Sequence, residues 1–329
     1  MKSTVRNASV FPVVLAALLG IGAAAPAAAQ QVEKVTLPTA RTVGETYVLE
    51  IRSAKSRTRG GKNTASGSTW RLNARVDAVA ADGGHVLRLE TVDVDLAMPP
   101  ESEQAGGMVK VFNDAMRRLM AVPIVLDMAP EGSVQGLRNK DQALAFAHDL
   151  VAATRKELLA GKTPVDAKLL DRVLTPLTQP SMLENSLLEP FTLLYFLSGV
   201  DLEMGETYVL DDEVPFPLTG TPLRSRILFA AKKVDRAAGT ATFDMRREIE
   251  PEDFHKAIKD FFTGFLRAAG KELPPDTELP FDQFVLETTA TYVYSLETGL
   301  PVSLRFVKQV SAPGGSQVET KDIDVRPAN

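Results

Sequence analysis

The sequence predicts an α+β fold: internally duplicated, curved antiparallel sheets that form half-barrels, with helices on the concave side and a helical insert. Two observations favour this fold. The hexapeptide GETYVL occurs at residues 44–49 and again, letter for letter, at residues 205–210. After each copy, apolar and polar residues alternate with the period of a strand that buries one face. A repeat at long spacing indicates that one structural unit occurs twice.

The first 29 residues have the layout of a secretory signal peptide. Lys2 and Arg6 precede an apolar run that ends in small residues, with Ala27 and Ala29 just before Gln30. This order is typical of a cleaved export signal, so we expect cleavage near Ala29 and a periplasmic location. No later apolar run reaches membrane-spanning length, and we therefore expect no transmembrane segment after cleavage.

The composition narrows the class of protein further. The chain has no cysteine, which excludes disulfides and a cysteine-linked lipid anchor. Its net charge of −5 argues against a general nucleic-acid binder. We therefore expect a protein of the bacterial envelope that is stabilised by its apolar core.

Residues 30–139 are the expected first β-rich repeat. Trp70, Leu72, Ala74 and Val76 alternate with polar residues in a strand at 68–80. The next strand, at 85–98, changes its apolar phase, which predicts a bulge near Glu90. A helix at 109–121 and a β-hairpin at 123–137 complete the unit.

Residues 201–329 are the expected second repeat, with its elements in the same order. Strands at 223–235 and 240–249 precede a helix that starts at Pro251 and ends before Gly270. A hairpin at 284–310 turns at Glu297–Gly299, and a last strand covers 316–325. The dipeptides Val76-Asp77 and Val234-Asp235 are expected to close equivalent strands.

Residues 140–200 have no counterpart in the other half, and they form the expected helical insert. Helices are predicted at 141–161, 163–177 and 181–199, with Gly161 and Gly199 as stops. The last of them is apolar on nearly all sides. It is therefore expected to be enclosed by protein between the two halves.

The helices of the two repeats carry stripes of Met and Phe that need a covering surface. Such stripes are most simply core, but Met and Phe also adapt to flexible apolar ligands, and a curved sheet closed over helices leaves room for a cavity. The sequence-based candidates for ligand binding are Trp70, Met108, Phe112, Met116, Leu119, Phe254, Phe261, Phe262 and Phe265.

The predicted hairpin tip at 52–63 is basic in an otherwise acidic protein. Such a tip is either a solvated loop or a surface that meets lipid headgroups or an acidic envelope protein. The candidate contact residues are Arg52, Lys55, Arg57, Arg59 and Lys62.

Catalytic and metal-binding patterns are weak. The three histidines lack zinc-protease spacing, and there is no nucleophile elbow. Asp93, Asp95 and Asp211 are carboxylates that would suit a hydrolase only if they converge in a cleft. We expect no catalytic residue, metal or cofactor, and therefore no enzyme.

The order of elements in each half, with the strand–ETGLP–strand hairpin at Glu297–Pro301, resembles the lipoprotein carrier and receptor of the Lol pathway and related envelope lipid-binding proteins. The resemblance implies an incomplete barrel with helices in its mouth that binds acyl chains inside. This chain differs in its duplication, in its insert at 140–200 and in having no lipidation cysteine.

The first hypothesis is therefore a periplasmic, non-enzymatic protein that binds a lipid or another apolar ligand and acts in envelope lipid or lipoprotein trafficking. The alternatives are a periplasmic scaffold or assembly factor acting through protein contacts, and a carboxylate-based hydrolase.

Overall fold

The computed structural model describes residues 34–97, 107–160, 178–216, 219–268 and 284–328. The predicted signal peptide at 1–29 and the predicted helix at 163–177 lie outside these ranges. Among the described residues, no helix is long and apolar enough to cross a membrane.

The first half contains β1 (Lys34–Thr36), β2 (Thr46–Arg59), β3 (Lys62–Val79), β4 (His85–Ala97), α1 (Gly107–Met120), β5 (Ile124–Met128) and β6 (Val134–Leu137). The insert contains α2 (Lys140–Ala160) and α4 (Pro180–Leu194). The second half contains β7 (Asp201–Glu203), β8 (Thr207–Pro215), β9 (Pro222–Asp235), β10 (Thr240–Ile249), α5 (Pro251–Ala268), β11 (Val285–Ser295), β12 (Pro301–Ala312) and β13 (Gly315–Pro327).

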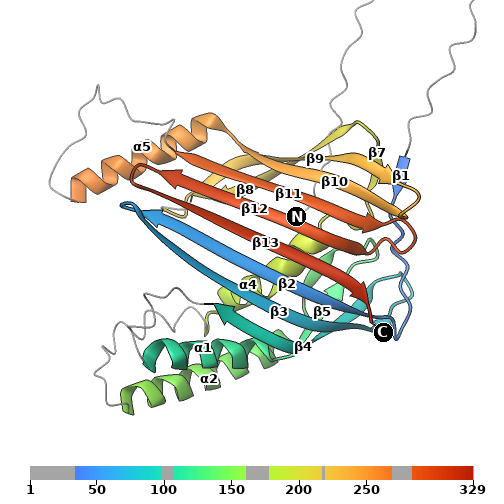
Figure 1. The fold of residues 1–329 in the computed structure, drawn as a ribbon, viewed down its shortest axis with the longest axis horizontal. Coiled ribbons are helices and arrows are strands. Elements are labelled where there is room, and N and C mark those ends of the chain that lie inside the picture. The colour runs from blue at the N-terminus through green and yellow to red at the C-terminus, as the bar shows by residue number, and fades with distance from the viewer. Residues whose placement is uncertain (1–33, 98–106, 161–177, 217–218, 269–283, 329) are drawn as a thin grey trace, which may run out of the picture.

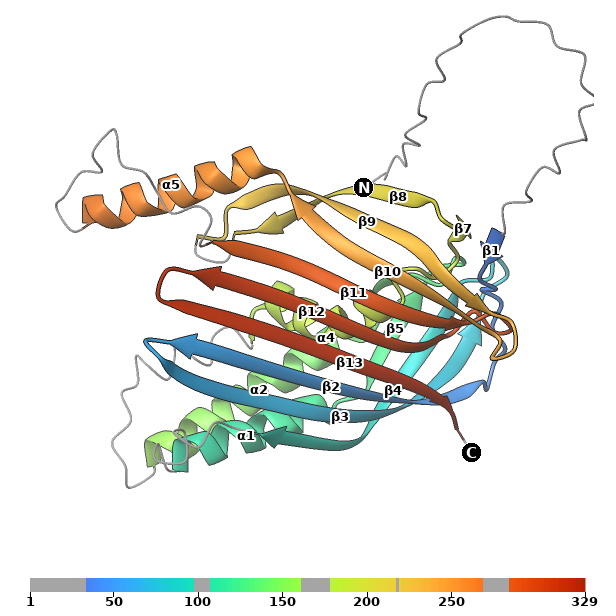
Figure 2. The same cartoon turned by 45° about the horizontal axis from the view of Figure 1, so that its top comes forward.

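Both halves belong to one curved antiparallel sheet, which does not close into a barrel (Figures 1 and 2). Its described strands number 11, in the order β6-β5-β4-β3-β2-β13-β12-β11-β10-β9-β8. The sequence left open whether the halves form one sheet or two, and the structure shows one, because β13 pairs with β2 along its whole length, from Gly315 opposite Arg59 to Pro327 opposite Tyr47. This pairing joins the end of the chain to its beginning.

The two halves run across this sheet in the same direction. Three strands, a helix and two strands follow one another as β2-β3-β4-α1-β5-β6 and as β8-β9-β10-α5-β11-β12. The two GETYVL copies enter β2 and β8 through Gly44 and Gly205, whose φ angles of 87° and 84° lie in the left-handed region that favours glycine. A shared origin of the halves stays a prediction.

The detailed equivalence of the second strands differs from the sequence prediction. Thr46 pairs with Arg75, whereas its counterpart Thr207 pairs with Ala230 rather than with Lys233. The strand pairing is therefore three residues out of step with the expected alignment of Val76 and Val234. In β4 the bulge lies at Val92, between Asp93 opposite Arg71 and Thr91 opposite Leu72, two residues beyond the expected position.

The helix α4 lies across the inner face of the curved sheet, which we call the concave face (Figure 2). Phe191 and Leu194 of α4 are fully buried, and Trp70 of β3 meets the ring of Phe191 edge-on, with the ring centroids 6.1 Å apart. This helix ends at Leu194, not at Gly199 as predicted, and its outer side is exposed at Met182. The insert is therefore enclosed on one side only.

The ETGLP turn between β11 and β12 is held by close packing against the N-terminal segment. Gly299 has a φ of 62°, and a Cβ atom added to it would lie 1.8 Å from the carbonyl oxygen of Pro38. Arg41 donates a hydrogen bond to the carbonyl oxygen of Thr298 at 2.7 Å. Only glycine fits at this position, so the turn is structural in this chain.

Candidate ligand-binding site on the concave face

Strand alternation decides which side chains face the helices. In β2, Tyr47, Leu49 and Ile51 are buried on the concave face, and the same phase continues through Ser53 to Lys55, Arg57 and Arg59. No register shift interrupts the pairing of β2 with β3 or β13. The basic residues of the hairpin tip therefore extend the face that forms the core.

Two apolar clusters lie on this face. The main cluster surrounds α4 and includes Trp70, Leu119 and Phe243. The second cluster lies under α5, where Val214, Leu223 and Ile258 are buried. Figure 1 shows α5 at the end of the sheet that also holds the β2–β3 and β12–β13 turns.

The second cluster is only partly covered. Phe254, Phe261 and Phe262 on α5 are half-buried, as are Ile249 and Leu286 on the strands below. The rings meet edge-on, Phe261 with Phe262 at 5.6 Å and Phe262 with Phe284 at 5.9 Å between centroids. This geometry leaves apolar ring surface open to contact with another apolar group.

The start of α5 is fixed to β9 by one strong ion pair. The guanidinium of Arg224 donates to both carboxylate oxygens of Asp253, at 2.7 and 2.9 Å, and the Arg224 backbone N–H donates to the same carboxylate. These bonds lower the pKa of Asp253 to about 2. The rest of the helix is held chiefly by its apolar face.

A row of polar side chains separates the two clusters. Paired positions on β10, β11, β12, β13, β2 and β3 place them side by side, and we call the set the polar row: Arg247, Thr288, Lys308, Glu319, Lys55 and Ser66. Arg247 donates to Asp212 of β8 at 2.6 Å, while Thr288 is buried.

The buried lysine Lys321 lies one step further toward the core. Its side chain is 8% exposed, and its ammonium lies 2.6 Å from Glu189 of α4 and 3.8 Å from Glu319. Glu189 also lines an open depression of about 460 Å³ along the outer side of α4, with Leu188, Thr192 and Leu193. The depression and the polar row are therefore connected through this ion pair.

A hydrogen bond between two tyrosines fixes the C-terminal end of α4. The hydroxyls of Tyr47 and Tyr195 are 2.5 Å apart, and the Tyr294 hydroxyl donates to the carbonyl oxygen of Leu194 at 2.8 Å. Burial raises the pKa of Tyr195 to about 12 and raises the pKa of Tyr47 well above its ordinary value, so both hydroxyls stay neutral at physiological pH. These bonds position the helix and offer no acid or base for chemistry.

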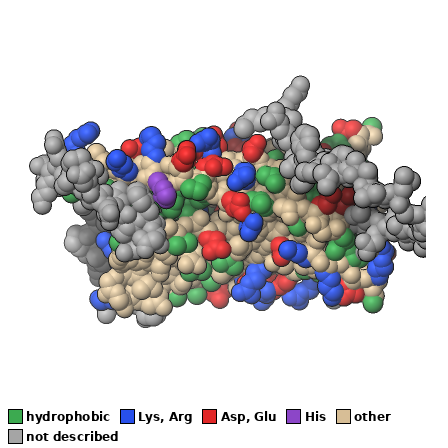
Figure 3. Space-filling model, turned by 90° about the horizontal axis from the view of Figure 1, so that it is seen from above, with side chains coloured by type: hydrophobic (Ala, Val, Ile, Leu, Met, Phe, Trp, Pro, Cys, Tyr) green, Lys and Arg blue, Asp and Glu red, His purple; other side chains and the backbone are tan. Residues whose placement is uncertain are grey.

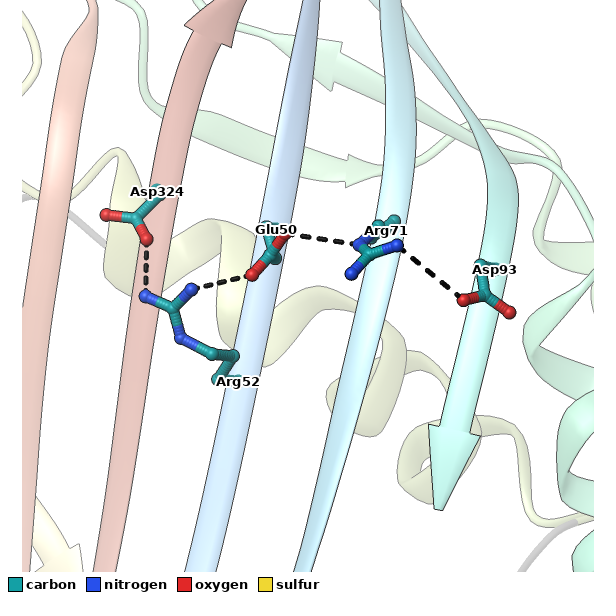
Figure 4. Close-up of polar contacts among 5 residues, drawn as sticks. All are labelled: Glu50, Arg52, Arg71, Asp93 and Asp324. Carbon is teal, nitrogen blue, oxygen red and sulfur yellow. Dashed lines mark hydrogen bonds and ion pairs between the residues drawn. The ribbon is translucent and has the colours of Figure 1, made fainter.

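The opposite, convex face carries charges that are paired with one another (Figure 4). Arg52 donates to Glu50 at 2.6 Å and to Asp324, and Glu50 also accepts from Arg71 at 3.1 Å. Arg71 lies 3.9 Å from Asp93, so the ladder spans four strands. Figure 3 shows a different side of the molecule, seen from above relative to Figure 1, and there too acidic and basic side chains are interspersed.

The predicted ligand-binding residues divide into three groups. Trp70 and Leu119 are buried in the main core, and the Trp70 indole N–H donates to Thr91. Met116, Phe254, Phe261 and Phe262 are half-buried. The side chains of Met108, Phe112 and Phe265 lie outside the described residues. A ligand contact for any of them stays a prediction.

The predicted basic contact residues also divide. Arg52 faces the convex side and is paired, while Lys55, Arg57, Arg59 and Lys62 are exposed at the tip. Sequence reasoning missed Lys308, Glu319 and Lys321, because only the strand register brings them beside Lys55. The available signal was that Lys308 and Lys321 occupy the same alternate positions as the buried Phe306 and Ile323.

The carboxylates proposed for a hydrolase do not converge. Asp93 lies on β4 and Asp211 on β8, which is the edge strand at the far side of the sheet. A separate depression of about 650 Å³ is lined by His85, Asp127 and Arg138, but Arg138 is already bonded to Asp127 at 2.7 Å. Within the described ranges, no group of three acidic or histidine residues could hold a metal ion.

No protein-family model and no curated protein matches the chain. Among solved structures, lipovitellin, in a structure of its lipid–protein interactions, matches at 11% identity and a TM-score of 0.41. That match covers 88% of this chain, which spans 26% of the lipovitellin chain.

Two further solved structures are more distant. A DUF1329 family protein from Desulfovibrio piger has 11% identity and a TM-score of 0.12, with 86% of each chain covered. MucB, in complex with MucA, has 8% identity and a TM-score of 0.13, covering 85% of this chain and 94% of the other. Similarities this low assign no function, so the function is argued from the chain's own geometry.

Proposed function

We propose that this protein is an exported, non-enzymatic carrier or receptor that holds an apolar chain of a lipid-like ligand on its concave face. The observation that supports it is the partly covered apolar surface there. Phe254, Phe261 and Phe262 on α5 are half-buried. Leu188 and Leu193 are half-buried beside the depression along α4.

An apolar chain gains free energy from such surface in proportion to the area that it covers. At about 25 cal/mol per Å² of apolar area, each methylene removed from water contributes about 0.8 kcal/mol. A chain of several methylenes laid over the half-buried side chains of α5, or in the depression along α4, would therefore bind with useful affinity although neither surface is enclosed. We propose, more specifically, that the protein is periplasmic and acts in envelope lipid or lipoprotein trafficking.

The first test is recovery of the ligand. The full chain, purified from an envelope fraction without detergent, should release a bound lipid on organic extraction, and native mass spectrometry should show the added mass. After delipidation, the protein should take up a fluorescent fatty acid.

A matched pair of variants localises the site. Leu193→Glu places a charge beside the depression and should weaken fatty-acid uptake by about tenfold or more, because the charge must be desolvated when the chain binds. Met182→Glu, at an exposed position on the same helix, should bind as the wild type does. Empty protein from every preparation, together with no uptake of fatty acid, would refute the proposal and favour a scaffold that acts through protein contacts.

A further inference from the structure

On the concave face, Arg247 and Lys321 are neutralised by carboxylates, but other basic side chains are not. Within the ranges that the structure describes, Lys55, Arg57, Arg59 and Lys62 make no ion pair, and neither does Lys308. On the convex face, by comparison, Arg52 and Arg71 are paired, whereas the exposed Arg305 and Arg326 make no ion pair with a described residue. Unpaired cations on the face with open apolar surface indicate that an external anion completes the site.

The arrangement of these cations has an intrinsic cost. Arg59 lies directly opposite Lys62 in the β2–β3 hairpin, and like charges at paired positions destabilise a hairpin. On the same face, Lys55 and Lys308 lie opposite Glu319 on the two neighbouring strands, and the Lys321 ammonium lies 3.8 Å from its carboxylate. Glu319 therefore lies on a face with five exposed or half-buried cations that make no ion pair, and the local charge stays positive although the whole chain is at −5.

The same strands place this charge next to apolar surface. The row beyond the polar row reads Leu286, Val310, Gln317, Arg57 and Thr64 across β11, β12, β13, β2 and β3. Its α5 side is apolar, and its β2 side is basic. An amphiphile lying along the row would find chain contacts at Leu286 and Val310, and charge contacts at Arg57 and Lys55.

We infer that the concave face selects an amphiphile with an anionic headgroup, which is bound by Lys55, Arg57 and Lys308 while its chain lies toward α5. The inference rests on the proposed function and adds the class and the orientation of the ligand. A phosphate or carboxylate headgroup has the chemistry that these ammonium and guanidinium groups recognise. The basic hairpin tip then orients the ligand at the end of the concave face that also holds α5.

The test compares three probes on the full, delipidated chain. Lysophosphatidylglycerol and lysophosphatidylcholine with the same acyl chain separate headgroup charge from chain binding, and inorganic phosphate tests the charge alone. At low salt, the anionic lipid should bind about tenfold or more tightly than the zwitterionic one. Inorganic phosphate at the concentration of the lipid should not displace it.

The variants localise the preference. K55A/R57A should remove the preference, so that the anionic lipid binds no more tightly than lysophosphatidylcholine. The control R305A/R326A removes two exposed cations from the convex phase of β12 and β13 and should keep the preference. Melting temperatures of both double variants show whether each is folded, and K55E/R57E should reverse the preference.

The outcomes separate the two proposals. Equal binding of both lipids by the wild type, or a preference that survives in K55A/R57A, overturns the headgroup inference and leaves chain binding intact. Displacement by inorganic phosphate alone would overturn it too, since the site would then be a simple anion site. Failure of every lipid to bind overturns the proposed function and this inference with it.

Discussion

At the residue scale, the concave face is defined by a few charged groups that lie among apolar ones. Lys321 is the clearest case, because its side chain is 8% exposed and depends on Glu189 at 2.6 Å for neutralisation. A buried ammonium without a partner is strongly disfavoured. The pair therefore holds α4 to β13, and it lies between the main core and the polar row.

Removing one partner of this pair should cost more than removing both. We expect Glu189→Gln to lower the free energy of unfolding by about 1–2 kcal/mol, since Glu189 is half-exposed and part of the full cost of a buried charge is relieved by water. Lys321→Met should cost less, and the double variant should recover most of the loss. Urea denaturation of the four proteins measures the coupling; strictly additive effects would show that the ion pair has no structural role.

His85 is a second residue whose environment has a measurable consequence. It is 6% exposed, and burial, with a further contribution from the charge of Arg41, lowers its pKa below the ordinary 6.5. The folded chain then binds fewer protons at this site than the unfolded chain does when the pH falls below about 6.5. Stability is therefore lost on acidification, between that pH and the lower pKa of the folded state.

We accordingly expect His85→Gln to flatten the decline of melting temperature between pH 7 and pH 5. The carboxylates titrate in both proteins, so the difference between the two curves isolates the histidine. Parallel curves for variant and wild type would contradict a depressed pKa at His85.

At the element scale, α5 is attached differently from α4. The helix α4 is fixed by buried side chains and by the tyrosine bonds near its C-terminal end, whereas α5 is anchored by Arg224 and Asp253 at its start and by half-buried phenylalanines. Elements with few fully buried contacts open more readily than the core. We therefore expect α5 to be the less protected of the two.

Loss of the anchor should loosen α5 without unfolding the sheet. In Arg224→Ala, amide hydrogen exchange in 251–268 should accelerate, while exchange in β11–β13 stays slow. Lys256→Ala is the control, because it removes an exposed ion pair with Asp260 within the same helix. Equal exchange in the wild type and Arg224→Ala would show that the apolar face alone holds the helix.

Most helices and strands could be predicted from the sequence, because strand alternation and helical periodicity depend only on residues close together in the chain. The alternation at Trp70 to Val76 and the apolar stripe of α5 need only the periods of strand and helix. The polar row could not be predicted in this way, because Lys55 and Glu319 are brought together by pairing between the first and last strands of the sheet. The end of α4 was misplaced because apolar residues continue to Leu197, in a turn that is itself buried.

At the scale of the whole molecule, both halves contribute to the 11-stranded sheet and to a small two-stranded sheet of β1 and β7, which has consequences for stability. The two halves of the chain meet where β13 pairs with β2, and Ile323 of β13 is fully buried opposite Ile51. An open sheet with a partly covered face is a suitable support for a ligand, because the strands hold the site without enclosing it. The same continuity couples the halves.

The halves should therefore unfold together. Fluorescence of Trp70, the single tryptophan, reports on the first half, and amide hydrogen exchange in β9 and β10 reports on the second. We expect the same urea midpoint from both probes, as in a two-state transition. Two separate midpoints would show that the pairing of β13 with β2 does not couple the repeats.

The account depends most on an apolar chain lying beside α5 on the concave face. Site-specific photo-cross-linking tests this directly, with benzoylphenylalanine placed at Phe262 on α5 and, as a control, at Val48 on the convex face of β2. We expect the probe at Phe262 to capture the acyl chain of an added lipid, detected as a mass increase of the intact protein, and the probe at Val48 to capture none. Equal capture at both positions, or capture at Val48 alone, would contradict the account.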